Sequence, residues 1–283
     1  MHVLGLDISD VRVVGVVADQ QGLVVRRARS EGPRAAQLAT ELAAGLTIVA
    51  FGAASETLPI DCSVLTVPDL PPVLVCAAGT ASVLAEAWVG AARGASHAIC
   101  LEIGDRVFAG ILLNGRPWTG AHGLAGSAAW LALNPVERQD YRKLGSLAAE
   151  VSSHGIARRL SWRIQAGDES VVLERAGTLE SITSAHVFDA ARAADGVAIS
   201  VVRDTAKYIG MALANLASCI DPEVVVLGGD IAAAGDLLFD SVRQEYGRRV
   251  PPAMAEQVRF AVSELGDEAT AIGAARFAAL ASS

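Results

Sequence analysis

Short apolar runs rich in β-branched residues occupy the first third of the chain, and turn-prone residues separate them. His2–Leu6, Val11–Val17 and Leu23–Arg29 are the first three runs. Each has the length and composition of a strand, so the pattern predicts a meander of three strands. The apolar spacing then predicts a helix over Ala35–Ala44 and a buried strand over Thr47–Phe51.

Prolines interrupt this pattern between residues 55 and 72. The segment is predicted to be mostly loop, with one short strand at Val64–Val67. A helix is predicted next, over Thr80–Ala92. Thr80 is suited to cap its first turn, and Gly94 follows its end.

The same order of elements then begins again. Strands are predicted at Ala98–Ile103 and Val107–Leu113, and Asn114-Gly115 is typical of a hairpin turn. Helices follow. Two successive units that open with paired strands predict two related lobes with a cleft between them.

The last third of the chain contains the clearest periodicity. Apolar residues recur every three or four positions over Val197–Ile220, which predicts a long amphipathic helix. The continuous apolar run Val224–Leu227 predicts a strand buried on both faces. A helix at 235–248, a strand at 258–262 and a helix at 268–280 complete the expected order.

Composition narrows the class of protein. The chain has 283 residues, of which 52% are apolar and 19% charged, and its net charge of −8 provides no basic surface for nucleic acid. Its apolar runs fall short of the roughly 20 residues that span a bilayer. We therefore expect a cytoplasmic protein that binds neither nucleic acid nor membrane.

Cysteine and histidine spacing gives no sign of a metal site. The four cysteines form no C-x-x-C pair and the five histidines no H-E-x-x-H motif. No metal is expected from the sequence.

Several stretches in the second part of the chain resemble the ROK family of sugar kinases and repressors. They are Leu84–Gly94, Gly120–Gly126, Ala212–Leu216, Asp221–Gly229 and Leu265–Ala275. The resemblance implies an α/β, actin-like (RNase H-like) two-lobed fold, here with a trimmed N-terminal lobe. It places the N-terminal lobe at residues 1–95, with the C-terminal helix 268–283 as a candidate part of it, and the C-terminal lobe at residues 96–267.

The chain departs from this family where kinase chemistry takes place. Counting back from Leu84, the family's N-D-A-N run falls on residues 77–80, so Ala78 stands at the position of the catalytic base. A methyl group cannot accept a proton, and general-base assistance worth roughly 10²–10⁴ in rate is lost.

Both phosphate loops of the family are also altered. The D-x-G-G-T loop is replaced by Asp7-Ile8-Ser9-Asp10-Val11, which lacks both glycines and adds a negative charge. In the second loop, Asp105 and Phe108 replace a hydroxyl and a glycine, while Arg106 is a possible anion ligand.

The family's sugar and zinc ligands are missing as well. Ser127 and Trp130 stand where the A-G-E-x-G-H motif has its glutamate and histidine, and Ser146 stands in place of a zinc-binding cysteine. Zinc is therefore not expected, because these side chains offer no suitable nitrogen or sulfur ligand.

The residues that remain near the expected cleft are mostly polar. The candidate ligand-binding set is Asp7, Glu102, Asp105, Arg106, His122, Ser127, Trp130, Gly228, Gly229 and Asp230. Asp230 stands where the glycine-rich turn on the adenosine side of the family's site ends.

The simultaneous losses predict a homologue that is inactive as a sugar kinase and has a ligand-binding, regulatory or scaffold role. The family resemblance implies a homodimer or higher homo-oligomer, and no cofactor is expected. One alternative is an enzyme that reuses the cleft for other chemistry, with Glu102, Asp105 and His122 as acid/base groups. Another is an active hexose or amino-sugar kinase that uses ATP and Mg²⁺.

A repressor that binds operator DNA is a further interpretation of the resemblance. Such proteins resemble one another in carrying a winged helix-turn-helix ahead of the kinase-like body. In this sequence the first predicted strand begins at His2. Direct operator binding is therefore not expected.

Overall fold

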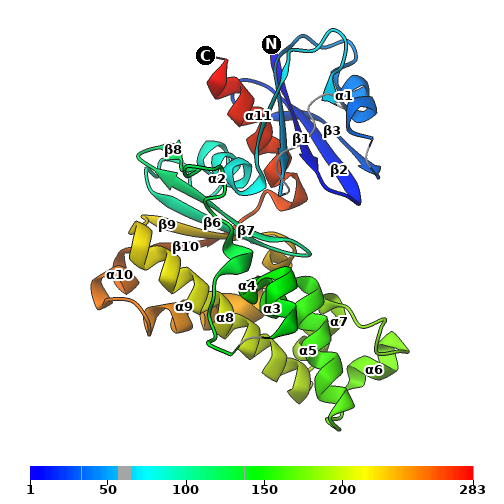
Figure 1. Ribbon diagram of the computed structural model, residues 1–283, viewed down its shortest axis with the longest axis vertical. Coiled ribbons are helices and arrows are strands. Elements are labelled where there is room, and N and C mark those ends of the chain that lie inside the picture. Colours follow the sequence, from blue (N-terminus) through cyan, green and yellow to red (C-terminus); the bar gives the residue numbers. More distant parts are fainter. Residues whose placement is uncertain (33, 57–64, 137, 283) are drawn as a thin grey trace.

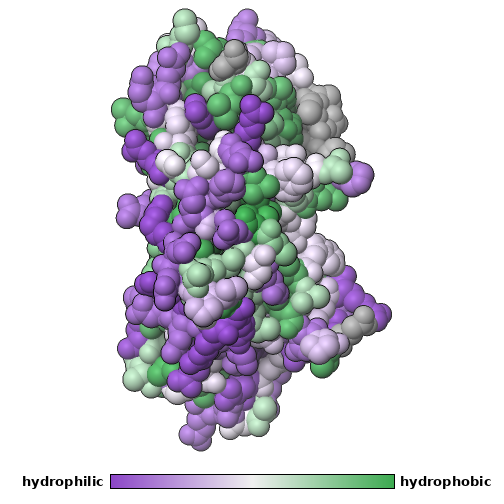
Figure 2. Space-filling model, turned by 90° about the vertical axis from the view of Figure 1, so that its left-hand side faces the viewer, coloured by the Kyte–Doolittle hydropathy of each residue, from purple (hydrophilic) through white to green (hydrophobic). Residues whose placement is uncertain are grey.

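The computed structural model describes residues 1–32, 34–56, 65–136 and 138–282. It has two sheets of five strands each, one in each lobe, placed one above the other along the longest axis (Figure 1). Polar side chains cover most of the face in Figure 2, and apolar residues gather where the two lobes meet. The two-lobed α/β fold predicted from the sequence is confirmed.

The first sheet belongs to the N-terminal lobe, and its strands follow the order β3-β2-β1-β4-β5. A helix, α1 (Ala35–Ala43), packs its apolar side against one face of this sheet. The strands are β1 (His2–Ile8), β2 (Arg12–Ala18), β3 (Val24–Glu31), β4 (Ile48–Ser55) and β5 (Val73–Ala77).

The second sheet repeats this arrangement. Its order is β10-β9-β6-β7-β8, so its first strand again pairs antiparallel with the second and parallel with the fourth. The repeat predicted from the sequence is therefore a repeat in topology. The strands are β6 (Ala98–Ile103), β7 (Val107–Leu113), β8 (Arg116–Pro117), β9 (Val224–Gly228) and β10 (Arg259–Val262).

A group of helices covers the outer face of the second sheet and forms the largest apolar core. The long helix α8 (Gly196–Ile220) lies at its centre and packs against α4, α5, α7 and α9. The other helices are α3 (Gln139–Leu144), α4 (Ser146–Val151), α5 (Ser153–Gln165), α6 (Val171–Ala176), α7 (Ser184–Arg192), α9 (Gly235–Gly247) and α10 (Pro252–Gln257).

Two helices join the lobes. The C-terminal helix α11 (Ala269–Ala281) returns to the first sheet and packs on β1 and β4, while α2 (Ala78–Trp88) packs on β6 and β7 of the second sheet (Figure 1). These two helices also pack on each other.

Glycines allow this junction to be close. A Cβ atom on Gly273 of α11 would lie 1.6 Å from the carbonyl oxygen of Ala81 in α2. A Cβ on Gly5 of β1 would lie 2.0 Å from the carbonyl oxygen of Ala271. Backbone therefore meets backbone at these crossings, and no larger residue fits without moving an element.

Some elements differ from the sequence predictions. Strand β5 was not predicted, because it follows directly on Pro71-Pro72, which favour a loop, and its pairing with β4 stabilises it. Helix α2 begins two residues before Thr80 and ends at Trp88, four residues earlier than predicted. Of the predicted strand Val64–Val67, Val64 lies outside the described residues and residues 65–67 form no strand.

The hairpin turn predicted at Asn114-Gly115 is confirmed. Both residues have positive φ angles, 52° and 73°, and the turn joins β7 to β8. Within the described part of the chain, no helix is long and apolar enough to cross a bilayer.

We predict that Gly273→Ala strongly destabilises the fold. The added methyl group would clash with the backbone of α2, which costs at least about 1–3 kcal/mol of unfolding free energy for overpacking. Gly196→Ala is the matched control, because a Cβ atom there meets nothing within 4 Å. Urea unfolding of both variants checks this, and equal midpoints would contradict the close packing.

Candidate functional site

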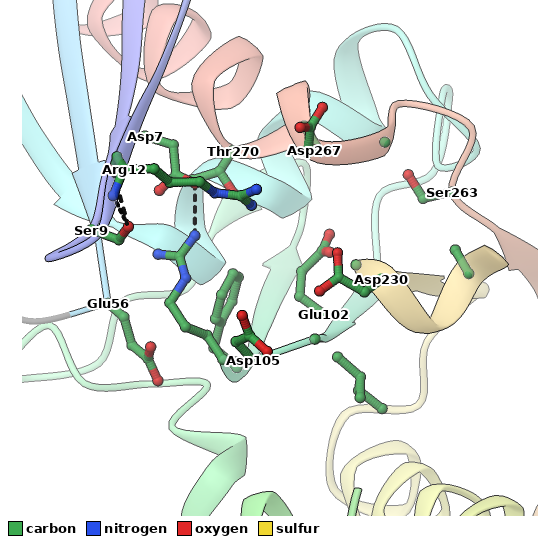
Figure 3. Close-up of a pocket in the computed structure, with 18 of the residues that line it drawn as sticks. Asp7, Ser9, Arg12, Glu56, Glu102, Asp105, Asp230, Ser263, Asp267 and Thr270 are labelled. Carbon is green, nitrogen blue, oxygen red and sulfur yellow. Dashed lines mark hydrogen bonds and ion pairs between the residues drawn. The ribbon is translucent and has the colours of Figure 1, made fainter. Parts of the chain in front are cut away.

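A cleft of about 720 Å³ lies between the lobes. The turns after β1 and β6 line it, together with the segment after β9 and the start of α11 (Figure 3). In an actin-like arrangement of two sheets, these strand ends face one another across the cleft. The repeated strand order therefore places the turns after β1 and β6 at the cleft.

The turn between β1 and β2 is held by hydrogen bonds between its own residues. The backbone N–H of Ser9 donates to the carbonyl oxygen of Arg12 at 3.0 Å, and the N–H of Arg12 donates to the Ser9 hydroxyl at 3.2 Å (Figure 3). That hydroxyl in turn donates to the Arg12 carbonyl oxygen at 2.9 Å. These donors are thus already used within the turn and do not point to a ligand.

The turn between β6 and β7 brings two more charged residues to the cleft. The N–H of Gly104 donates to the carbonyl oxygen of Arg106 at 2.9 Å, which leaves Asp105 exposed at the tip. A Cβ atom on Gly104 would lie 2.7 Å from a carboxylate oxygen of Asp230. The carboxylate of Asp230 therefore covers this turn.

An ion pair links the lobes across the cleft. Arg106 Nη2 from the C-terminal lobe donates to Asp7 Oδ2 of β1 at 2.7 Å (Figure 3). The guanidinium of Arg106 also lies 5.4 Å from the ring centre of Phe108. Burial alone would lower the pKa of Arg106, but Asp7 raises it above its ordinary value, so the pair is ionic.

The pair leaves two buried polar atoms without partners. Asp7 is only 3% exposed, and its Oδ1 atom has no hydrogen-bond partner among the described residues. The same holds for Arg106 Nη1. Buried polar groups are usually satisfied, so one acceptor and one donor of this pair have unmet hydrogen-bonding capacity at the border of the cleft.

Glu102 is a second buried carboxylate of the cleft. It lies at the end of β6, accepts a hydrogen bond from the Ser82 hydroxyl and contacts the Cys100 thiol at 3.4 Å. Burial raises the pKa of Glu102 above its ordinary value, and the hydrogen bond from Ser82 opposes that rise.

Negative charge dominates the lining. Among the described residues, eight carboxylates and only two guanidinium groups border the cleft. Arg29, outside the lining, pairs with Asp267 at 2.8 Å, but the carboxylates stay in large excess. The carboxylates are Asp7, Asp10, Glu56, Glu102, Asp105, Asp230, Glu264 and Asp267, and the guanidinium groups are Arg12 and Arg106.

The structure brings most of the residues proposed from the sequence to this cleft. Six of them line it, namely Asp7, Glu102, Asp105, Arg106, Gly229 and Asp230. Gly228 lies behind Glu102, since a Cβ there would come within 2.5 Å of that carboxylate.

His122, Ser127 and Trp130 lie outside the lining. All three are exposed, and Trp130 reaches 58% exposure. They follow β8 in a segment whose Ser127 hydroxyl donates to the carbonyl oxygen of Leu124 at 2.7 Å. The aromatic side chain of the cleft lining is thus Phe108 and not Trp130.

Other cleft residues were missed from the sequence. Glu56 follows β4 at the start of the proline-rich segment, which was predicted as loop without function. Burial raises the pKa of Glu56, Arg106 opposes this rise, and Asp7 adds to it. Glu264 and Asp267 lie on either side of Leu265-Gly266, which opens a stretch that resembles the ROK family. This position beside the stretch was the one sign in the sequence that they belong to the site.

Ala78 is buried at the first residue of α2 and does not line the cleft. Within the described ranges, no group of three histidine, cysteine, aspartate or glutamate side chains could hold a metal ion. The Ser146 hydroxyl is buried, has no hydrogen-bond partner among the residues that the structure describes, and offers no strong metal ligand.

Comparison with proteins of known sequence shows long matches. The sequence signature of the ROK family matches residues 56–281. The glucokinase of Halalkalibacterium halodurans is 33% identical over 204 residues, which cover 71% of this chain and 62% of that glucokinase. The glucokinase of Streptomyces coelicolor is 24% identical over 306 aligned positions, covering 97% of this chain and 96% of that protein.

Solved structures share the fold over nearly the whole chain. The ROK family glucokinase from Streptomyces griseus, solved in complex with glucose and AMPPNP, matches with a TM-score of 0.80 at 23% identity and covers 99% of this chain and 100% of that one. A ROK hexokinase from Thermus thermophilus has a TM-score of 0.76 at 25% identity, and the match covers 99% of both chains.

The repeated strand order, the cleft between lobes and these matches define an actin-like protein of the sugar-kinase type. The chain belongs to the ROK family. Its matched part spans about 62% of the first of these glucokinases.

A nucleoside triphosphate, the group that this fold implies, does not fit the residues of the cleft. Phosphate sites use backbone N–H groups, hydroxyls and cations. Here the N–H groups of Ser9 and Arg12 are bonded within the first turn, Arg106 is paired with Asp7, and eight carboxylates border the cleft among the described residues.

We predict that Glu102 makes stability depend on pH. Because its pKa is raised in the folded chain, its contribution is fully present below the ordinary value of 4.5 and is lost as the pH rises through the folded pKa. Glu102→Gln should therefore be more stable than the original chain at pH 8, with the difference shrinking toward pH 4.5.

Thermal unfolding between pH 4.5 and pH 8 checks this prediction. Glu174→Gln is the control, because Glu174 is exposed and outside the cleft. The prediction is wrong if the difference in stability between Glu102→Gln and the original chain is the same at pH 4.5 and at pH 8.

Proposed function

We propose that this ROK homologue binds a small, unphosphorylated polar molecule in its cleft and does not transfer phosphate from a nucleotide. The observation that carries the proposal is the charge of the lining, with eight carboxylates against two guanidinium groups among the described residues. The relatives named glucokinase and xylose repressor favour a sugar or a sugar derivative, such as an amino sugar, as the ligand class.

The repulsion between a triphosphate and the cleft carboxylates can be given to order of magnitude. Two like charges about 4 Å apart near a protein surface repel by about 4 kcal/mol. A triphosphate would meet Asp10, Asp105 and Asp230, all of them exposed to the cleft. Of the two guanidinium groups in the described lining, Arg106 is already paired with Asp7, so Arg12 faces the remaining carboxylates as the one cation left to offset this charge.

The missing base supports the same conclusion. Ala78 carries only a methyl group at the position that the family resemblance assigns to the base. The buried carboxylate of Glu102 stands elsewhere, at the end of β6, where it accepts a hydrogen bond from the Ser82 hydroxyl. Loss of a general base lowers phosphoryl transfer by roughly 10²–10⁴.

We expect purified chain to show no phosphate transfer from ATP to any hexose and no rise in melting temperature with ATP and Mg²⁺. A variant with Asp10→Asn, Asp105→Asn and Asp230→Asn should gain an ATP-dependent rise, because three repulsive charges are removed. Thermal-shift and radiolabel-transfer assays measure both results.

A control variant with Glu174→Gln, Asp240→Asn and Glu256→Gln removes three exposed carboxylates outside the cleft. It should not gain nucleotide binding. Phosphate transfer by the original chain that disappears when one cleft residue is changed would overturn the proposal.

The expected homo-oligomer stays a prediction, which light scattering of the purified chain checks.

A second candidate, an enzyme that reuses the cleft for acid–base chemistry, is favoured by one observation. Glu102 is a buried cleft carboxylate whose pKa is raised by burial, and such a shifted carboxyl group in a cleft is a candidate for acid–base chemistry. Incubating the chain with any ligand that raises its melting temperature separates the candidates. An unchanged ligand by NMR supports binding alone, and conversion that Glu102→Gln abolishes supports the enzyme.

A further inference from the structure

We infer that the ligand of the cleft carries a positive charge: the structure assigns the space between Asp7, Glu102 and Asp230 to a protonated organic amine. This inference rests on the proposed function, because it names the chemical class of the ligand for the same cleft. The fold leads one to expect an anionic ligand, and we infer an organic cation instead.

The first step is the field inside the cleft. Both lobes contribute carboxylates, with Asp10 and Glu56 on the N-terminal side and Asp105 and Asp230 on the C-terminal side. A concave site lined by one sign of charge concentrates the potential and raises the local concentration of the opposite ion. A cation that enters the cleft is therefore attracted from both walls.

The second step is the unpartnered Asp7. Its side chain is almost fully buried and borders the cleft, and its Oδ1 atom accepts no hydrogen bond from the described residues (Figure 3). An ionised carboxylate accepts several hydrogen bonds, and a buried one without them is costly. An ammonium group beside Asp7 would supply the missing donor.

The third step is that the chain already places one organic cation in this cleft. The guanidinium of Arg106 reaches from the opposite lobe and binds the other oxygen of Asp7 at 2.7 Å. Its contact with the Phe108 ring shows that the site holds a cation between a carboxylate and an aromatic face. A ligand amine would use the same kind of surroundings beside it.

The fourth step separates an amine from a metal ion. A metal needs several ligand atoms at one point, and no such group of three acidic, histidine or cysteine side chains occurs in the described part of the chain. The acids are instead spread along the cleft. An ammonium group has three N–H donors that point in different directions, so spaced acceptors suit it.

The paired probes are 1,4-diaminobutane and 1,4-butanediol, which have the same chain length and differ in charge. At matched ionic strength, the diamine should raise the melting temperature of the full chain and bind by calorimetry, whereas the diol should do neither. Binding should weaken as salt increases, because the attraction is electrostatic.

Two substitutions locate the site. Asp230→Asn should weaken diamine binding roughly tenfold, the value of one charge-assisted hydrogen bond. Asp240→Asn removes an equally exposed aspartate outside the cleft and should leave the affinity unchanged. Arg106→Gln removes the competing cation from Asp7, so it should increase diamine affinity several-fold even though it lowers the stability of the free chain.

An increase in affinity is a result that a purely structural role of Arg106 would not produce. If Arg106→Gln does not fold, the comparison of the two aspartate variants still decides. Equal effects of diamine and diol, or equal losses in Asp230→Asn and Asp240→Asn, would overturn the amine inference. In that case the absence of phosphate transfer would still support the proposed function, whereas ATP-dependent transfer would defeat it separately.

Discussion

The contact of α11 with the first sheet and with α2 is the constraint on which the rest of the structure depends. It is made by backbone atoms, because Gly5 and Gly273 have no side chain to separate the elements. Through this crossing the end of the chain closes the first lobe and fixes its position over the second. The cleft, its width and the reach of Arg106 to Asp7 all follow from that fixed position.

The cleft that results is bordered mostly by carboxylates among the charged residues that the structure describes. The first turn uses the N–H groups of Ser9 and Arg12 internally, and the second turn carries Asp105 and an Arg106 that is paired with Asp7. The fold therefore fixes where a ligand binds, and the side chains decide which class of ligand can bind there.

Much of this could be predicted from the sequence. The two-lobed fold and most strands followed from short apolar runs, because β1, β6 and β9 are buried on both faces. Strand β5 was missed because it follows directly on Pro71-Pro72, which favour a loop, and it depends on its pairing with β4.

Within the site, positions taken from the family resemblance led to Asp7, Arg106 and Asp230, all of which line the cleft. The contribution of Glu56 depends on how two distant loops meet in space, which no local pattern encodes. The exposed position of Trp130 depends on the path of the chain after β8 in the same way.

The bridge between Asp7 and Arg106 has a consequence for how this sequence can change over time. Replacing Asp7 alone would leave a partly buried guanidinium unpaired, and replacing Arg106 alone would leave a buried carboxylate unpaired. Descendant sequences would therefore tend to keep both residues or exchange both together. The two positions are therefore inherited together, and exchanging the pair would require two coordinated substitutions in different lobes.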